Sequence, residues 1–155
     1  MTSKPPPPPP TPPPSGPFIQ AALICEKVLE EKDGVLSLVR VVDRLTHVVN
    51  APSMPAELPH VQFQCVLLIM LKSGRARGRH QVEVVLEHPS GRRTNSVSTS
   101  VQLEGEERGA NLIARTTVTF DAEGLYWFDV LVDGGLLTRI PFRMMYQLVS
   151  TGTRS

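Results

Sequence analysis

One histidine and one serine stand close enough along the chain to suggest nucleophilic chemistry. His88 is followed by Pro89, Ser90 and Gly91, and a histidine beside a serine can take the hydroxyl proton while the oxygen attacks an acyl carbon. Such a nucleophile also requires a third group that orients the histidine, and nothing near this pair in the sequence marks one. Because Pro-Ser-Gly is typical of a tight turn, we interpret Ser90 as a turn residue and keep a small hydrolase as an alternative.

The other residue types that carry chemistry are dispersed. The four histidines occur singly, and the two cysteines, Cys25 and Cys65, lack the Cys-x-x-Cys spacing of a metal site. No glycine-rich phosphate loop precedes a helical pattern. We therefore expect no catalytic residue, no metal site and no cofactor. Both cysteines stand among apolar residues, which favours buried free thiols, with one structural disulfide as the alternative.

A cluster of basic side chains could form a contact surface. Arg75, Arg77 and Arg79 occupy alternate positions, and such a cluster could hold a phosphate or a nucleic acid. The acidic residues at 104–107 are expected at the same end of the fold, within about one Debye length of ~8–10 Å, where they would neutralise the arginines. No aromatic residue is interleaved for base stacking. We therefore expect no nucleic-acid partner, and self-association through the complementary segments stays open.

Alternating apolar and polar residues, bounded by glycine, proline and aspartate, predict short β-strands. No long helical period occurs. The eight predicted strands are residues 18–29, 35–49, 60–71, 79–88, 94–103, 110–120, 125–132 and 136–146. Predicted turns and loops lie at 31–34, 50–59, 73–78, 89–91, 104–109 and 133–135. Strands of this number and length predict an all-β sandwich or small barrel.

The last two predicted strands form a hairpin whose register follows from its turn. Residues 133–135, Asp-Gly-Gly, fit a three-residue loop with glycine in the left-handed conformation. The resulting cross-strand pairs are Val130–Thr138, Phe128–Ile140, Asp129–Arg139 and Trp127–Pro141. Pro141 cannot donate a ladder hydrogen bond, so the last strand is an edge or bulges there. Trp127, on the outer face, is either packed under a loop or part of a contact surface.

The spacing of Gly124, Tyr126 and Phe128 narrows the fold class. These alternate positions match the residues around a tyrosine corner, in which the tyrosine hydroxyl bonds to the backbone a few residues upstream. The pattern predicts a single antiparallel β-sandwich, immunoglobulin-like and with about eight strands, over residues 18–147. It indicates an architecture and says nothing about a ligand.

The two ends of the chain differ from this body. Ten of the fifteen prolines lie within residues 1–17, a composition that favours extended polyproline II and buries almost nothing. We expect a disordered proline-rich N-terminal tail, which serves as a tether or as a ligand for a proline-binding groove. Residues 148–155 are expected to be a flexible C-terminus.

Length and charge limit the protein class. The chain has 155 residues and a net charge of +1, which suits one domain plus a tail and gives no argument for nucleic-acid or membrane partners. No apolar run reaches the ~18 residues of a membrane helix. The start lacks the apolar stretch of a secretory signal. We therefore expect a cytoplasmic protein without a membrane partner.

Several segments resemble a known protein family. They are residues 22–25, 33–34, 36–44, 109–113, 124–128, 132–134 and 140–143. Together they resemble a widespread family of small uncharacterised bacterial proteins, a domain of unknown function, across residues 19–147. The resemblance implies a compact β-sandwich and implies no activity, cofactor or site residue.

The expected function is a non-catalytic binding or adaptor module with an unknown protein partner. This expectation rests on the fold and on the absence of a recognisable catalytic group, since fold alone does not define a function. The alternative is a structural subunit that joins a larger assembly through an edge strand or its loops. The candidate partner-contact residues are Arg75, Arg77, Arg79, Trp127, Arg139 and Arg143.

Overall fold

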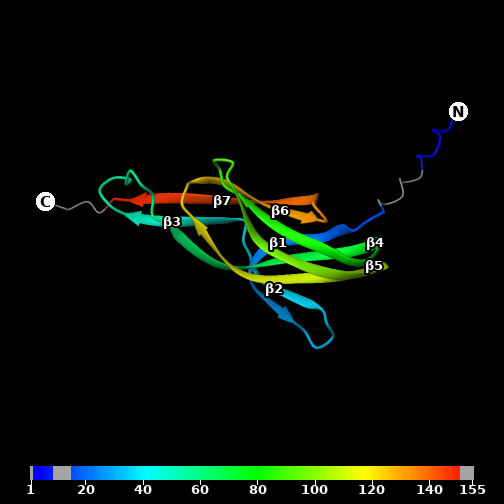
Figure 1. The fold of residues 1–155 in the computed structure, drawn as a ribbon. Helices are drawn as coiled ribbons and strands as arrows, with labels where there is room; N and C mark the ends of the chain where they lie inside the picture. The colour runs from blue at the N-terminus through cyan, green and yellow to red at the C-terminus, as the bar shows by residue number, and fades with distance from the viewer. Residues whose placement is uncertain (1, 9–14, 151–155) are drawn as a thin grey trace.

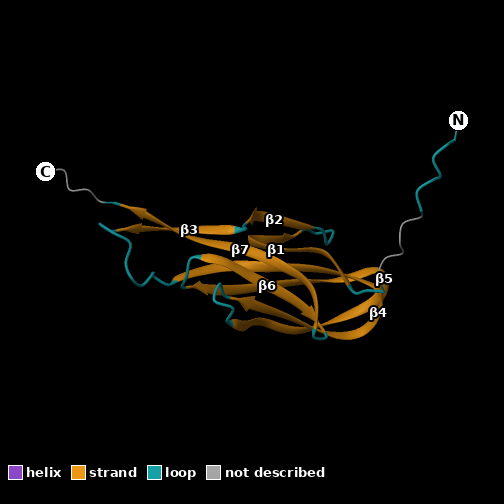
Figure 2. Cartoon of the chain, turned by 90° about the horizontal axis from the view of Figure 1, so that it is seen from above, coloured by secondary structure: helices purple, strands orange, loops and turns teal. Residues whose placement is uncertain are grey.

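A computed structural model describes residues 2–8 and 15–150, and this part of the chain forms an all-β fold (Figure 1). Strands and loops account for all of these residues, without a helix (Figure 2). In particular, no helix long and apolar enough to cross a membrane occurs among them. The seven strands are β1 (Phe18–Glu30), β2 (Leu36–Val41), β3 (Arg44–Asn50), β4 (Val61–Glu87), β5 (Arg93–Phe120), β6 (Gly124–Val132) and β7 (Gly135–Val149).

The strands belong to one mixed sheet. Their order is β2-β1-β4-β6-β7-β3, and β5 pairs with β4 beside this path. Neighbouring strands are antiparallel except β3 and β7, which run parallel with Arg44 opposite Arg143. The all-β expectation is confirmed, but the eight antiparallel strands predicted from the sequence are corrected to seven strands in a mixed sheet.

Two predicted turns, at 73–78 and 104–109, lie inside continuous strands. β4 has 27 residues and β5 has 28, and the two pair along their lengths, with Gly74 opposite Glu106 and Gly78 opposite Leu103. Gly74, Gly78 and Gly105 have φ angles of 58°, 88° and 96°. The register shifts between Lys72 and Gly74 and between Gly74 and Arg77, and such bulges bend a pair of strands without reversing either chain. The glycine signals therefore mark a shared bend, and the turn predictions are wrong there.

The predicted strand 35–49 is divided at Val42 and Asp43. β2 and β3 are consecutive in the chain, yet they lie at opposite ends of the sheet order. The Val42 N–H donates to the carbonyl of Ile24 in β1 at 2.8 Å, and the Arg143 N–H in β7 donates to the carbonyl of Asp43 at 3.0 Å. Val42 and Asp43 therefore connect β1, near one end of the sheet order, to β7, near the other end. The sheet thus curls around a common interior.

The interior holds one main apolar core. The rings of Phe120 and Phe142 stack with their centroids 5.1 Å apart, and Tyr126 meets Phe120 edge-on at 4.8 Å. A smaller cluster of Cys25, Val28 and Val66 lies apart from this core. The residues predicted to point inward from the closing hairpin are all buried: Tyr126, Phe128, Val130, Val132, Ile140, Phe142, Met144 and Tyr146.

Both cysteines are buried free thiols, as their apolar surroundings in the sequence predict. Burial raises the pKa of Cys65 to about 11. Burial also raises the pKa of Cys25, against a smaller lowering effect of hydrogen bonding with the Lys27 backbone. Neither thiol is therefore prone to ionise near neutral pH.

The predicted register of the closing hairpin is confirmed at all four pairs. Pro141 lies where β7 has β6 on one side only, because β3 pairs with β7 from Arg143 onward. The missing N–H of Pro141 therefore costs no ladder hydrogen bond. The expected edge exists over residues 135–142, whereas residues 143–149 are covered by β3.

The N-terminal tail meets the body just before β1. The Arg75 N–H donates to the Ser15 carbonyl at 2.6 Å, and a Cβ added at Gly16 would lie 2.3 Å from the Ser73 carbonyl oxygen. Residues 2–8 are exposed and lack regular structure, and residues 1 and 9–14 of the expected disordered tail lie outside the described residues. At the other end β7 reaches Val149, and residues 151–155 also lie outside them.

Candidate functional site: a cleft between the two halves of β5

The bend of β4 and β5 brings the two halves of β5 to the same cavity. This cavity has a volume of about 390 Å³, which falls within the range of roughly 300–1,000 Å³ that is usual for ligand sites. Its hydroxyl and amide side chains come from both halves of β5: Thr94, Asn95, Ser96, Thr116, Thr117 and Thr119. Its buried apolar lining is Leu86, Val118 and Tyr126. The cavity therefore combines polar walls with an apolar interior.

One edge of β5 is open along this cavity. In the part of the chain that the structure describes, β5 pairs with β4 alone, whereas β4 has β5 on one side and β1 and β6 on the other. An unpaired strand edge presents a row of backbone N–H and C=O groups that can accept another strand. Natural proteins usually shorten, charge or cover such edges, so a long open edge next to a cavity points to a binding surface.

His88 joins the two loops at one end of the cavity. It follows β4 directly, and Asp121 follows β5 directly. The Nε2 atom of His88 lies 2.6 Å from Oδ1 of Asp121, and its Nδ1 atom lies 2.8 Å from Oγ of Ser90. The sequence identified His88 and Ser90 but no third group. The structure provides one in Asp121, so that the serine, histidine and aspartate form one hydrogen-bonded chain.

A backbone amide defines which nitrogen of His88 carries hydrogen. The Ser90 N–H, which can only donate, lies 3.0 Å from Nδ1, so Nδ1 is an acceptor. Nε2 faces a carboxylate and therefore carries the hydrogen. The hydrogen bond from His88 lowers the pKa of Asp121, and the Arg92 guanidinium, 3.5 Å from Asp121, lowers it further against the opposing effect of burial.

The Tyr126 hydroxyl fixes the loop that carries Asp121. It accepts the N–H groups of Asp121 at 3.3 Å and of Ala122 at 3.2 Å, and it donates to the Ala122 carbonyl at 3.2 Å. The hydrogen bond to the upstream backbone that the Gly-x-Tyr spacing predicts is therefore present. Burial is the main cause that raises the pKa of Tyr126, and the His88 ring packs edge-on against it with centroids 5.2 Å apart.

A second histidine has the opposite hydrogen-bonding environment. Nδ1 of His80 lies 2.6 Å from Oδ2 of Asp133, and its Nε2 lies 3.0 Å from the Arg77 carbonyl. Because both partners accept, both ring nitrogens must donate, which favours the protonated imidazolium. The hydrogen bond to Asp133 accordingly raises the pKa of His80. The N–H of Gln81 and then His80 lower the pKa of Asp133.

A charged network covers the outer face next to β6. Asp129 is only 3% exposed and accepts from Arg139 Nε at 2.6 Å and from Arg93 Nη1 at 2.9 Å. Glu87 lies 2.6 Å from Arg139 and 3.1 Å from Arg93. The predicted Asp129–Arg139 pair is therefore present. Glu87 and Arg93 join it because β4 and β5 continue the sheet on the other side of β6.

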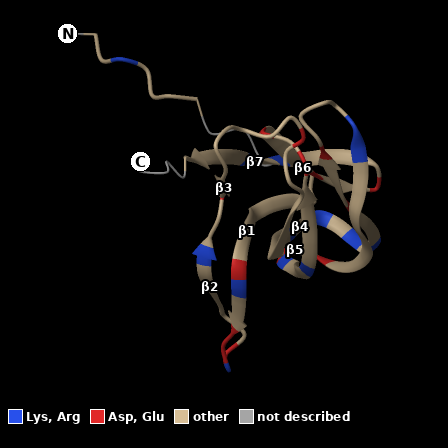
Figure 3. Ribbon diagram, turned by 90° about the vertical axis from the view of Figure 1, so that its left-hand side faces the viewer, with Lys and Arg blue, Asp and Glu red and all other residues tan. Residues whose placement is uncertain are grey.

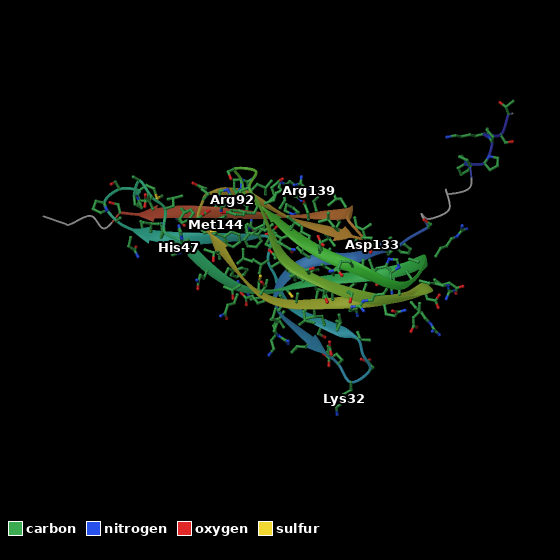
Figure 4. All side chains as sticks on the ribbon, viewed as in Figure 1. Lys32, His47, Arg92, Asp133, Arg139 and Met144 are labelled. Carbon is green, nitrogen blue, oxygen red and sulfur yellow. The ribbon has the colours of Figure 1, made fainter. Side chains whose placement is uncertain are left out.

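Two of the candidate contact residues touch each other on this face. The guanidinium carbon of Arg139 lies 4.5 Å from the centroid of the Trp127 ring, a cation–π geometry. Arg139 and Arg92 point outward on the same side of the molecule (Figure 4). Arg143 is exposed and lies opposite Arg44 in the register of the parallel β3–β7 pair. Trp127 is half-buried and alternates with the buried Tyr126 and Phe128, which places it on the outer face, where Arg139 packs over its ring.

The other three candidates lie at the bend of β4. Arg75, Arg77 and Arg79 are exposed and do not line the cavity. Arg77 lies opposite Glu104 in the strand pair and donates to the Glu104 carbonyl at 2.7 Å, and Arg79 donates to Ser100 Oγ at 3.0 Å. Basic and acidic residues both occur along the β4–β5 pair (Figure 3). The six predicted contact residues do not form one site.

Residues 2–8 and 15–150 contain no group of three or more histidine, cysteine, aspartate or glutamate side chains that could hold a metal ion. The cavity and Asp121 are the features that sequence reasoning missed. One signal for Asp121 was present, because the tyrosine corner predicts that the Tyr126 hydroxyl reaches the backbone a few residues upstream. Nothing in the sequence indicates that the β4–β5 turn meets this loop.

The fold and the cleft define a small all-β protein with a curled mixed sheet and an open-edged cavity. The model of a family of unknown function, DUF6941, matches residues 20–145. The chain belongs to this family. No curated protein matches the chain.

Two of the solved structures that match the chain show distant similarity. The alkylpurine DNA glycosylase AlkC of Pseudomonas fluorescens, bound to DNA with an abasic site analogue, is 14% identical with a TM-score of 0.40; the match covers 63% of this chain and 27% of the glycosylase. The CARDB domain of a Pyrococcus furiosus protein, in complex with di-metal ions, is 14% identical with a TM-score of 0.40, over 83% of this chain and 90% of that domain. The chain thus spans about a quarter of the glycosylase, and similarity this low carries no argument about function.

Proposed function

We propose that the protein is a binding module that holds an extended segment of a protein partner against the free edge of β5. The observation that carries this proposal is the open edge of β5, which lines a cavity of about 390 Å³ from both of its halves. An added strand gains main-chain hydrogen bonds from such an edge, and a neighbouring pocket selects one of its side chains. Binding of this kind requires no catalysis.

The lining of the cavity favours a particular kind of segment. The hydroxyl and amide groups of the walls can bond to a peptide backbone or to polar side chains. The buried surface of Leu86, Val118 and Tyr126 suits one apolar side chain. We therefore expect an extended peptide with a single apolar anchor between polar residues.

The proposal also covers the architecture of the domain and the cellular compartment of the protein. The first half of β4 pairs with β1 and the second half with β6, an arrangement that supports an immunoglobulin-like sandwich, as does the Tyr126 hydroxyl bonded to upstream backbone. The buried free thiols of Cys25 and Cys65 support a reducing compartment, the bacterial cytoplasm.

A peptide-display selection on the full chain tests the binding proposal. Thr119 is exposed and lines the cavity, so Thr119→Lys should weaken the selected peptides at least tenfold. Thr46, which is exposed on β3, provides the matched control, and Thr46→Lys should leave the affinity unchanged. Equal affinities for both variants would place the binding surface elsewhere and contradict the proposal.

A second candidate function is self-assembly through the β1–β2 hairpin. This hairpin projects from the body (Figure 3), with Lys32 at its tip (Figure 4). Val35, Val39 and Val41 are 60%, 40% and 59% exposed on it, and apolar side chains gathered on an exposed element mark a contact surface. Light scattering at two concentrations tests this function, because Val41→Lys should reduce any oligomer that the unmodified chain forms.

A further inference from the structure

We propose that Ser90 is an activated nucleophile that accepts acyl groups from esters, with His88 as its general base and Asp121 as the residue that positions the base. This activity goes beyond the proposed peptide binding and does not depend on it. Three observations support it: the Ser90–His88–Asp121 hydrogen-bonded chain, the tautomer of His88, and the cavity that His88 and Asp121 line.

The geometry of Ser90 suits proton transfer. Ser90 is exposed on the turn between β4 and β5, and its Oγ lies 2.8 Å from Nδ1 of His88, within the reach of a general base. The Arg92 N–H approaches the same oxygen at 3.3 Å and occupies one of its acceptor positions. The hydroxyl hydrogen is directed toward Nδ1 of His88, whose single lone pair it shares with the Ser90 N–H.

His88 is held in the form that can accept this proton. The Ser90 N–H defines Nδ1 as the acceptor, and Asp121 receives the hydrogen on Nε2 at 2.6 Å. When Nδ1 takes the hydroxyl proton, the imidazolium that forms is stabilised by the Asp121 carboxylate. His80 cannot play this part, because both of its nitrogens already donate to acceptors.

The proposed reaction proceeds in two balanced steps. Ser90 Oγ forms a bond to the carbonyl carbon of an ester while its proton moves to His88 Nδ1. The bond to the alcohol oxygen then breaks, and the alcohol leaves with that proton. Water attacks the acyl-serine in the same way, giving its proton to Nδ1, and the release of a carboxylic acid restores the Ser90 hydroxyl.

The cavity supplies a place for the substrate. His88 and Arg92, the two residues bonded to the Ser90 hydroxyl, both line it, together with the apolar surface of Leu86 and Tyr126. A short acyl chain can occupy this apolar part. The Ser90 and Gly91 amides are occupied by His88, so the Arg92 guanidinium is the group assigned to the developing oxyanion.

The same hydrogen bonds would also be found in a turn that His88 merely braces. Reactivity separates the two interpretations, because a brace does not activate the hydroxyl. The full chain is treated with a fluorophosphonate probe, whose labelling sites are mapped by mass spectrometry, and separately with p-nitrophenyl butyrate. Ser98→Ala is the matched control, since the Ser98 hydroxyl bonds to Gln81 and not to a histidine.

The expected result is covalent labelling at Ser90 and ester hydrolysis that Ser90→Ala abolishes and Ser98→Ala preserves. His88→Gln should slow labelling about 100-fold or more, the smallest contribution usual for a general base. Labelling spread equally over exposed serines, or labelling of Ser90 that His88→Gln leaves unchanged, would overturn the proposal. Circular dichroism and thermal midpoints of each variant exclude loss of the fold as the cause.

The positioning role of Asp121 has its own readout. Nitrogen-15 spectra of the His88 ring should show hydrogen on Nε2 in the unmodified chain and a shift toward Nδ1 in Asp121→Asn, with a parallel loss of labelling. Asp121→Glu, which keeps the carboxylate, should retain part of the rate. Equal rates in Asp121→Asn and the unmodified chain would remove Asp121 from the proposal. Peptide binding is measured separately, so failure of either proposal leaves the other intact.

Discussion

His88 and Asp121 lie just outside opposite ends of β5, yet their side chains are 2.6 Å apart. A straight strand of the 28 residues in β5 would extend about 90 Å at ~3.3 Å per residue. The contact therefore exists because β4 and β5 bend back on themselves at residues 73–78 and 103–109. The same bend creates the cavity and brings both halves of the open edge to it.

The bend depends on close backbone contact at Gly109. A Cβ added there would lie 1.8 Å from the Leu71 carbonyl oxygen. Gly109→Ala must move one of the two paired strands, and we expect a loss of roughly 1–3 kcal/mol in the free energy of unfolding. At Gly135 an added Cβ would be 3.5 Å from its nearest neighbour, so Gly135→Ala should change stability by about 0.5 kcal/mol or less. Urea unfolding of both variants checks this, and equal effects would contradict it.

The Tyr126 hydroxyl should contribute measurably to stability. Tyr126→Phe leaves the N–H groups of Asp121 and Ala122 without their acceptor, in a region where the ring is fully buried. The expected loss is about 1–2 kcal/mol in the free energy of unfolding. Chemical denaturation monitored by tryptophan fluorescence measures it, and a neutral substitution would show that the loop holds its shape without this hydroxyl.

The His80–Asp133 pair predicts a dependence of stability on pH. The pKa of His80 is raised, so its contribution is complete below about pH 6.5 and is lost as pH rises through the raised value. The pKa of Asp133 is lowered, so its contribution is present above about pH 3.9 and is lost as pH falls. The pair should therefore stabilise the fold most between about pH 4 and 6.5.

Thermal midpoints of the unmodified chain and of His80→Gln across this range test the pH dependence. The difference between the two should be greatest in mildly acidic solution and should shrink at alkaline pH. His47→Gln serves as a control, because the structure gives His47 a ring contact with Tyr146 rather than a carboxylate partner. A difference that does not vary with pH would contradict the predicted protonation of His80.

The charged network around Asp129 predicts which of its substitutions destabilises the fold most. Asp129 is almost fully buried, whereas Arg93 and Arg139 are partly exposed. Replacing both arginines by methionine leaves a buried carboxylate without a cation, which is the costly outcome. Asp129→Asn leaves two partly exposed arginines that remain in contact with water and paired with Glu87. Urea unfolding should therefore rank the double arginine variant as the less stable, and the reverse order would contradict the network.

The closing hairpin could be predicted from the sequence because its information is local. The alternation on either side of the turn predicts the four pairs from Trp127 to Val130, and Pro141 indicates where β7 lacks a second neighbour. The predicted three-residue loop at 133–135 is wrong, because the turn is Asp133-Gly134, with Val132 opposite Gly135 and a register shift between Val130 and Leu131 that restores the predicted pairs. The outer-face pair of Asp129 and Arg139 follows from the same register. All-β class and the inward-facing residues of β6 and β7 are likewise properties of short segments.

The cavity and Asp121 could not be predicted, because they depend on long-range geometry. Glycines at 74, 78 and 105 allow either a reversal or a bulge, and only the pairing of β4 with β5 decides between the two. The division at Val42 and Asp43 depends in the same way on contacts with β1 and β7. A glycine in the sequence shows that the backbone can adopt a positive φ at that position, but it does not show whether the chain reverses there or continues as a bulged strand.

Hydrogen exchange along β5, followed by mass spectrometry with and without a selected peptide, tests the binding proposal most directly. In the free protein the amides on the open edge of β5 should exchange quickly, because no strand pairs with them in the described part of the chain. Bound peptide should slow exchange in residues 94–96 and 116–119 together. Protection confined to other strands, or to the bend that carries Arg75, Arg77 and Arg79, would contradict a partner held along β5.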